Sequence, residues 1–220
     1  MNHTISIITA PREPQTLNAC ITSLRNIRYR DVINIFAEPS ENYYCINQPN
    51  ICFNVHSEKK GAFKNFDYAL KWNIQNSSKN IFVIVSDDTI FTEDFNLALT
   101  EGMNKHPEAV FACFVLKTMP NINNLCGRTG WNDLSNVGWD FQGGNFAMSK
   151  ATATKIINHP FYINHLLNYK ENQQIDACIA EVCKLMQIPF YAHNNSLTYT
   201  IGVISTLGHR SGLSDGLGLR

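Results

Sequence analysis

The apolar positions of the chain switch between short strand-like runs and helix-like spacing. Runs at residues 4–9, 32–37 and 81–85 are β-branched and apolar, which predicts buried strands. Between the first two runs, four residues recur at helical spacing: Leu17, Cys20, Ile21 and Leu24. A strand, a helix and a strand within about forty residues form a βαβ unit, whose default is a parallel strand pair.

The remainder of the chain continues this alternation. Further strands are predicted at residues 51–55, 109–116, 142–149, 188–192 and 196–201. Helices are predicted after Gly61, over residues 94–105, after Ser149 and over residues 175–186. Thr92 and the acids after it are expected to cap the helix at 94–105 and to give it an acidic first turn. The pattern predicts an α/β protein with a central, mostly parallel or mixed sheet flanked by helices.

Composition narrows the class of protein. The chain has 220 residues, which suits a single domain. Its 18 Lys and Arg balance 18 Asp and Glu, so nothing in the charge favours duplex DNA or an anionic membrane. The seven cysteines are odd in number and form no CxxC pair, which fits a reducing cytoplasm. The first apolar stretch is too short for a signal peptide or membrane span, so we expect a cytoplasmic protein. The oligomeric state stays open.

Two acids, Asp87 and Asp88, follow Ser86 where the strand at 81–85 should leave the sheet. Ligands of open α/β sheets bind at the carboxyl ends of the strands. Adjacent carboxylates repel unless a positive charge lies between them, and a divalent cation shared with substrate phosphates is the usual solution. The alternative is an Asp-Asp turn that caps the next helix. The sequence favours a metal site.

Other candidate residues follow the neighbouring strands. Arg12 suits a phosphate and Glu38 suits a ribose or a base, and the alternative for each is a solvated loop charge. Lys60, Gly61 and Asn65 lie near a predicted helix start, where backbone N–H groups favour anions. Neither GxxxxGK[ST] nor GxGxxG is present.

The segment 117–144 is rich in Asn, Gly and Trp, and a loop of this length is usually functional or mobile. Trp131 and Trp139 are expected either to form an acceptor platform or to plug the edge of the core. Asp176 lies in the first turn of the helix at 175–186, where spacing alone favours compensation of the helix dipole.

The order of these motifs resembles that of A-type-fold (GT-A) nucleotide-sugar glycosyltransferases, family-2-like in type. The matching segments run from residue 4 to about 210: a strand with TAPR, a strand with an acid, KKGAFKN before a helix, VIVSDD, GGNFAMS and a late Asp. The resemblance implies a single GT-A-like (Rossmann-related) domain at residues 1–208 and a flexible tail at 209–220.

The resemblance also implies a role for each candidate residue. Asp87 and Asp88 would bind Mn²⁺ or Mg²⁺ on the diphosphate, with Asp88 the better match for the direct ligand. Thr9, Ala10, Pro11, Arg12 and Glu38 would hold the nucleoside of a donor, UDP-type by preference. Gly143, Gly144 and Asn145 would line the sugar pocket. Asp176 would be the base of an inverting reaction on an acceptor hydroxyl, whether of a saccharide, a lipid-linked acceptor or another molecule. One acid of the family's usual Glu-Asp pair is missing there. A reaction that retains the configuration at the anomeric carbon stays an open alternative.

Two other classes of function share these features. A nucleotidyltransferase also needs a carboxylate-held metal beside a nucleotide, but it releases pyrophosphate. A catalytically silent nucleotide-sugar binding module would bind the donor without transfer.

The C-terminal segment has its own expectation. Thr200 stands where the family usually has a histidine, and His209 follows in a glycine-rich run. The tail could close over the donor as a lid that brings His209 to the metal, or it could be a frayed terminus.

Overall fold

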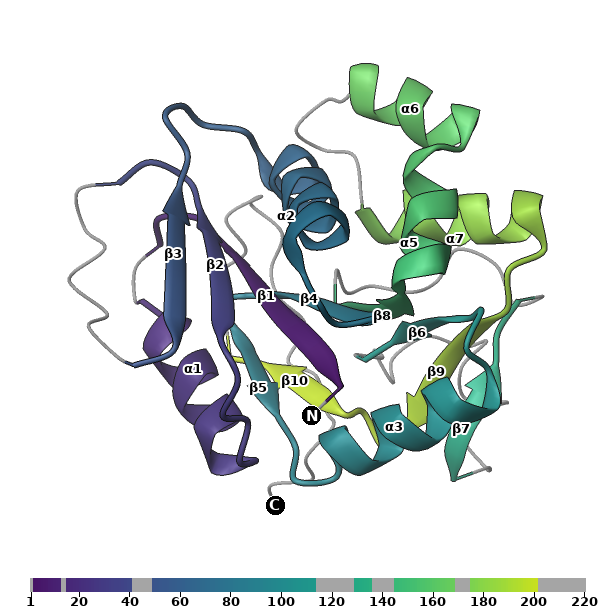
Figure 1. Cartoon of the computed structure of the whole chain (residues 1–220), viewed down its shortest axis with the longest axis horizontal. Coiled ribbons are helices and arrows are strands. Elements are labelled where there is room, and N and C mark those ends of the chain that lie inside the picture. Colours follow the sequence, from purple (N-terminus) through teal and green to yellow (C-terminus); the bar gives the residue numbers. More distant parts are fainter. Residues whose placement is uncertain are drawn as a thin grey trace.

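The computed structural model describes residues 2–12, 15–40, 49–113, 129–135, 145–168 and 175–201. Within these ranges, helices cover both faces of a mixed eight-stranded sheet (Figure 1). This confirms the predicted α/β class. None of the helices in the described ranges combines the length and the apolar character that a membrane crossing requires.

The strands of the main sheet lie in the order β3-β2-β1-β4-β8-β6-β9-β7. Their bounds are β1 His3–Thr9, β2 Ile33–Ala37, β3 Ile51–Val55, β4 Ile81–Ser86, β6 Val110–Ala112, β7 Gly130–Asp133, β8 Phe146–Ser149 and β9 Phe190–Asn194. The first four strands run parallel, which confirms the predicted βαβ unit. β8 runs antiparallel to β4 and to β6, and thereby joins the two halves of the sheet. A second, antiparallel sheet pairs β5 (Thr89–Phe91) with β10 (Thr198–Thr200).

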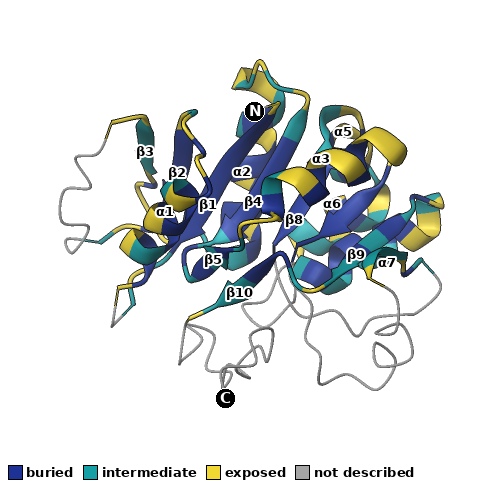
Figure 2. Ribbon diagram, turned by 90° about the horizontal axis from the view of Figure 1, so that it is seen from below, coloured by how far each residue is buried: buried dark blue, intermediate teal, exposed yellow. Residues whose placement is uncertain are grey.

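The helices lie in two groups, one on each face (Figure 1). One group contains α2 Ala62–Asn76, α5 Lys150–Ile157, α6 Pro160–Leu167 and α7 Ile175–Met186. The other contains α1 Leu17–Asn26 and α3 Phe95–Lys105. Along β4, Phe82 and Ile84 join the first core cluster, whereas Val83 and Val85 join the second. β4 is therefore buried on both faces, as its apolar run predicts, and Figure 2 shows it largely dark blue.

The predicted start of α3 is confirmed only in part: the N-cap residue lies in the predicted segment, but the acidic first turn is wrong. Asp94 is the N-cap residue of α3 and makes no side-chain capping bond, and the first turn holds no acid. Thr92 follows β5 directly, and its hydroxyl donates to the carbonyl oxygen of Leu197 at 3.0 Å. Pairing between β5 and the segment that leads into β10 therefore engages the hydroxyl that was expected to cap the helix.

Several other boundaries differ from the sequence pattern. β6 is shorter than the run at 109–116, of which residues 114–116 lie outside the described ranges, as do residues 142–144 of the run that contains β8. β9 begins two residues later than predicted, because its register with β6 is set by Phe190 opposite Val110. The pattern does not predict β5, β7 or α6. β7 reads Gly-Trp-Asn-Asp and becomes a strand through its pairing with β9.

Candidate active site

Three chain segments meet at the carboxyl edge of the central parallel strands. Beyond β1 and β2, the backbone N–H of Glu38 donates to the carbonyl of Thr9 at 3.0 Å. Beyond β4, the N–H of Asp87 donates to the carbonyl of Ile8 at 3.1 Å. The loop after β1, Glu38 and the Asp87–Asp88 turn are thus neighbours, at the edge where ligands of α/β sheets bind.

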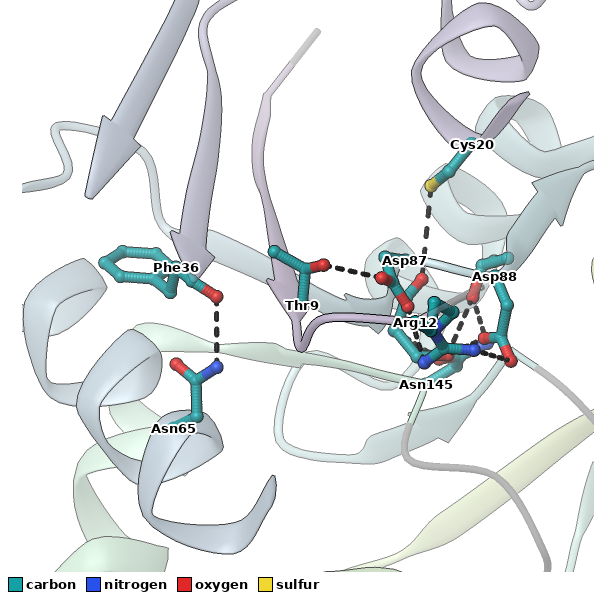
Figure 3. A network of polar contacts seen from close by, with 10 residues as sticks. Thr9, Arg12, Cys20, Phe36, Asn65, Asp87, Asp88 and Asn145 are labelled. Carbon is teal, nitrogen blue, oxygen red and sulfur yellow. Dashed lines mark hydrogen bonds and ion pairs between the residues drawn. The ribbon is translucent and has the colours of Figure 1, made fainter. Parts of the chain in front are cut away.

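Arg12 lies between the two acids (Figure 3). Its Nη2 is 2.7 Å from Asp87 Oδ1, and its Nη1 is 3.0 Å from Asp88 Oδ2. The side chains of Arg12 and Asp88 keep 13% and 16% of their exposure, and that of Asp87 keeps 2%. Adjacent carboxylates were expected to need a positive charge between them, and in this structure the guanidinium of Arg12 supplies that charge.

Two hydroxyls also donate to the carboxylates. Thr9 Oγ1 donates to Asp87 Oδ2 at 2.5 Å, and Ser86 Oγ donates to Asp88 Oδ1 at 2.5 Å. Burial raises the pKa of Asp87 to about 6, and the Asp88 charge adds to this, while Arg12 and the Thr9 hydroxyl act in the opposite direction. Asp87 Oδ1 has its ion pair but no hydrogen bond of good geometry within the described ranges. Asp87 is thus a buried carboxylate that depends on Arg12.

Asn145 holds the turn in place from the start of β8. Its Oδ1 accepts the backbone N–H of Ser86 at 3.0 Å, and its Nδ2 donates to Thr89 Oγ1 at 2.9 Å. Asn145 is almost wholly buried. The structure therefore commits this amide to the two residues that flank the acids, and its predicted contact with a donor sugar stays a prediction.

Glu38 caps the N-terminus of α2. Its two carboxylate oxygens accept the backbone N–H groups of Lys60, at 2.6 Å, and Gly61, at 2.8 Å. Gly61 has φ 79, a conformation that glycine adopts without strain. The N–H groups at this helix start were expected to bind an anion, and the buried carboxylate of Glu38 takes that place. The helix dipole favours a negative charge at this position. A ribose or base contact of Glu38 stays a prediction.

Lys60 and Asn65 lie beside this cap in different environments. Lys60 Nζ pairs with Glu58 at 2.7 Å, and its side chain is 30% exposed. Asn65 is buried, donates to the carbonyl of Phe36 at 3.0 Å and lies 2.9 Å from His56 Nε2 (Figure 3 shows the Phe36 contact). Asn65 therefore joins α2 to the ends of β2 and β3. The sequence pattern missed His56, whose signal is only its position directly after the predicted strand at 51–55.

Trp131 lies far along the sheet from the acids. It is on β7, four strands from β4, which corresponds to roughly 19 Å. Its indole N–H donates to the carbonyl of Ala98 in α3 at 2.8 Å, and its ring packs edge-on against Phe111. These contacts match the core-edge alternative, and an acceptor role for Trp131 stays a prediction.

Asp176 lies in the first turn of α7, as predicted, and is buried. Its Oδ1 accepts the N–H of Ala177 at 3.1 Å. α7 packs against α2, α5 and α6. Its position agrees with the sequence expectation, and its role stays a prediction.

Some predicted residues lie outside the described ranges: Trp139, Gly143, Gly144, His209 and the tail at 209–220. Ile201, the last described residue, donates its N–H to the carbonyl of Asp88 at 2.9 Å. Among the described residues, no group of three or more His, Cys, Asp and Glu could hold a metal ion. Asp87 and Asp88 therefore have no third residue of these types beside them in the described part of the chain.

The comparison with known proteins finds a solved structure with a similar fold. No protein-family model and no curated protein sequence matches the chain. Its structure is similar to that of GalNAc-T7, a GT-A glycosyltransferase whose crystal structure contains UDP, GalNAc and Mn²⁺. The TM-score is 0.62 at 10% sequence identity, over 93% of this chain. The match covers 46% of the GalNAc-T7 chain, so this chain spans less than half of that protein. At this identity the likeness shows a common, GT-A-like fold.

Proposed function

We propose that the protein is a glycosyltransferase that moves a sugar from a nucleotide-sugar donor, in the first place a UDP sugar, to an acceptor hydroxyl. The observation that carries the proposal is the Asp87–Asp88 turn at the carboxyl end of β4, beside the loop after β1 and Glu38 after β2. This is the edge at which α/β sheets bind nucleotides. The fold shared with GalNAc-T7, whose structure contains UDP and Mn²⁺, supports this donor class. The motif order supports a family-2-like relationship.

Asp87 and Asp88 would hold Mn²⁺ or Mg²⁺. Such ions are commonly bound by one or two carboxylates together with substrate phosphates and water. A two-carboxylate site fits this sharing, and the described residues offer no larger cluster. When bound, the ion supplies positive charge that stabilises the departing diphosphate.

The remaining steps belong to side chains of the protein. Lys60 lies at the start of α2 with its side chain partly exposed, so its ammonium group could reach a phosphate. Asp176 would accept the proton of the acceptor hydroxyl as this oxygen attacks the anomeric carbon, which gives inversion.

The remaining assignments rest on the sequence. Gly143 and Gly144 would line the sugar pocket, Trp139 would contact the acceptor, and His209 would join the metal shell as part of a closing tail. Cys20, Cys52, Cys113, Cys178 and Cys183 are free thiols, which agrees with the proposed cytoplasmic location.

The test is a thermal-shift screen over nucleotide sugars, with and without Mn²⁺, followed by product analysis of the best donor. The proposal expects Mn²⁺-dependent stabilisation by UDP and release of a nucleoside diphosphate. Release of pyrophosphate would replace it with a nucleotidyltransferase. Donor binding without hydrolysis or transfer to any acceptor would replace it with a binding module.

A further inference from the structure

Arg12 uses two of its nitrogens on two different carboxylates. Nη1 pairs with Asp88 and Nη2 with Asp87, so one guanidinium bridges the pair and is itself largely buried there. Its Nε is buried and has no hydrogen-bond partner in the described ranges. A guanidinium has five N–H donors in a fixed fork, and an acidic pair alone leaves part of that capacity unused.

A divalent ion and this guanidinium compete for the same oxygens. Such an ion binds carboxylate oxygens at about 2.1 Å. An ion on Asp87 Oδ1 would therefore lie within about 5 Å of Arg12 Nη2, which is 2.7 Å from that oxygen. Two cations at this separation repel strongly where protein excludes water. Arg12 in its present position thus opposes binding of the metal alone.

We propose that Arg12 is the resident counter-ion of Asp87 and Asp88, that a divalent cation binds by displacing it, and that the displaced guanidinium binds the diphosphate of the donor. The first half concerns the acids alone, and the second rests on the proposed function. Arg12 lies in the loop after β1, outside any helix or strand, so its side chain can turn without breaking regular structure. Each phosphate group of a diphosphate offers two neighbouring oxygens, which can accept two parallel N–H bonds from the guanidinium.

This arrangement makes metal and nucleotide bind together. When no nucleotide is bound, a cation that displaces Arg12 from the two carboxylates deprives the guanidinium of these anionic partners. With UDP present, Arg12 exchanges carboxylates for phosphates, and the acids become available to the metal. By linkage, Mn²⁺ and UDP must then strengthen each other's binding by the same factor.

The test measures binding of Mn²⁺ alone by calorimetry for the wild type, Arg12→Gln and the control Lys71→Gln. Lys71 forms a partly buried ion pair with Asp67 on α2, so the control removes a cation from another aspartate. Arg12→Gln is expected to bind Mn²⁺ at least about tenfold more tightly than the wild type, and UDP should enhance Mn²⁺ binding less in this variant. Lys71→Gln should match the wild type. Equal or weaker Mn²⁺ binding by Arg12→Gln, or no Mn²⁺ binding by any of the proteins, would overturn the proposal.

A second variant covers the case in which Arg12→Gln does not fold. Arg12→Lys keeps the charge as a single ammonium group that cannot bridge both carboxylates in the same way. Its affinity for Mn²⁺ alone should exceed that of the wild type, and an unchanged value would count against the proposal.

Sugar transfer by the wild type is measured separately. If the variants bind Mn²⁺ more tightly but the wild type transfers no sugar, only the glycosyltransferase function is rejected. If the wild type transfers sugar but the variants do not bind Mn²⁺ more tightly, only the counter-ion role of Arg12 is rejected.

Discussion

Asn145 accepts the backbone N–H of Ser86 through its side-chain oxygen, across 59 residues of sequence. This bond holds the end of β4, and with it the two acids, against β8. Asn145→Ala should leave the partly buried N–H of Ser86 without its partner, at a cost of about 1 kcal/mol of unfolding free energy. It should also weaken Mn²⁺-dependent UDP binding, because the turn loses its support. Asn73→Ala, which removes a buried amide bonded to Ser6, is the control and should lose stability but keep UDP affinity. Equal UDP affinity in both variants would contradict the supporting role of Asn145.

Asp88→Asn keeps the side-chain volume and removes a charge from the proposed metal site. Mn²⁺-dependent affinity for UDP should fall at least about tenfold, or roughly 1.4 kcal/mol, as measured by calorimetry. Folding should survive, because the change also removes repulsion between adjacent acids. Glu101→Gln on the exposed face of α3 is the control. Unchanged affinity in Asp88→Asn would remove the metal-site hypothesis.

Asp176→Asn tests the proposed base. If Asp176 takes the proton of the acceptor, turnover should fall by about a hundredfold or more while UDP affinity stays unchanged. If it only complements the helix dipole, the cost is below about 1 kcal/mol of stability and activity persists. Asp94→Asn removes an exposed acid at the N-cap of α3 and should behave as the wild type.

Glu38→Gln tests the cap of α2. An amide has one acceptor oxygen, so its NH₂ group would face a backbone N–H that the carboxylate now satisfies. We expect a loss of about 1 kcal/mol in urea unfolding, since one partly buried N–H loses its carboxylate partner. Glu58→Gln, on an exposed side chain next to the same helix start, should leave stability almost unchanged. Equal stability of the two variants would show that the cap contributes little.

His3 gives the fold a pH dependence. Burial lowers the pKa of His3 from 6.5 to about 4, and its Nε2 has no hydrogen-bond partner in the described ranges. The folded state therefore binds fewer protons than the unfolded state between these values. The stability that neutral His3 provides is complete above pH 6.5 and is lost as the pH falls to about 4, by about 3 kcal/mol at most. His3→Phe, which preserves ring contact with Tyr29, should lose less unfolding free energy between pH 7 and pH 4.5 than the wild type. Parallel losses in both proteins would reject this role.

The sequence predicted the parts of the fold that local patterns determine. Five apolar residues before Ser86 predict β4, and the acids that follow it mark the carboxyl edge of the sheet. Helical spacing locates α1, α2 and α7, and Ser149 caps α5 as expected by accepting the N–H of Thr152. These features depend on neighbours in sequence.

The parts that the sequence missed depend on distant partners. Arg12 was expected to be near a phosphate, but its pairing with both acids follows from β1 and β4 being adjacent in the sheet, across 76 residues. Glu38 caps a helix that begins more than twenty residues later, which the sequence does not indicate. β7 has no apolar alternation and exists because β9 lies beside it.

β8 has a consequence for the order in which the protein assembles. It inserts between β4 and β6 although it follows both in the chain, so the two halves of the sheet cannot join until residues 146–149 have been synthesised. A nascent chain or proteolytic fragment that ends at residue 113 would present β4 as an unpaired, apolar edge, which is prone to pair with other chains. The four parallel strands therefore should not form a soluble unit by themselves, and deletions that remove β8 should aggregate rather than keep part of the function.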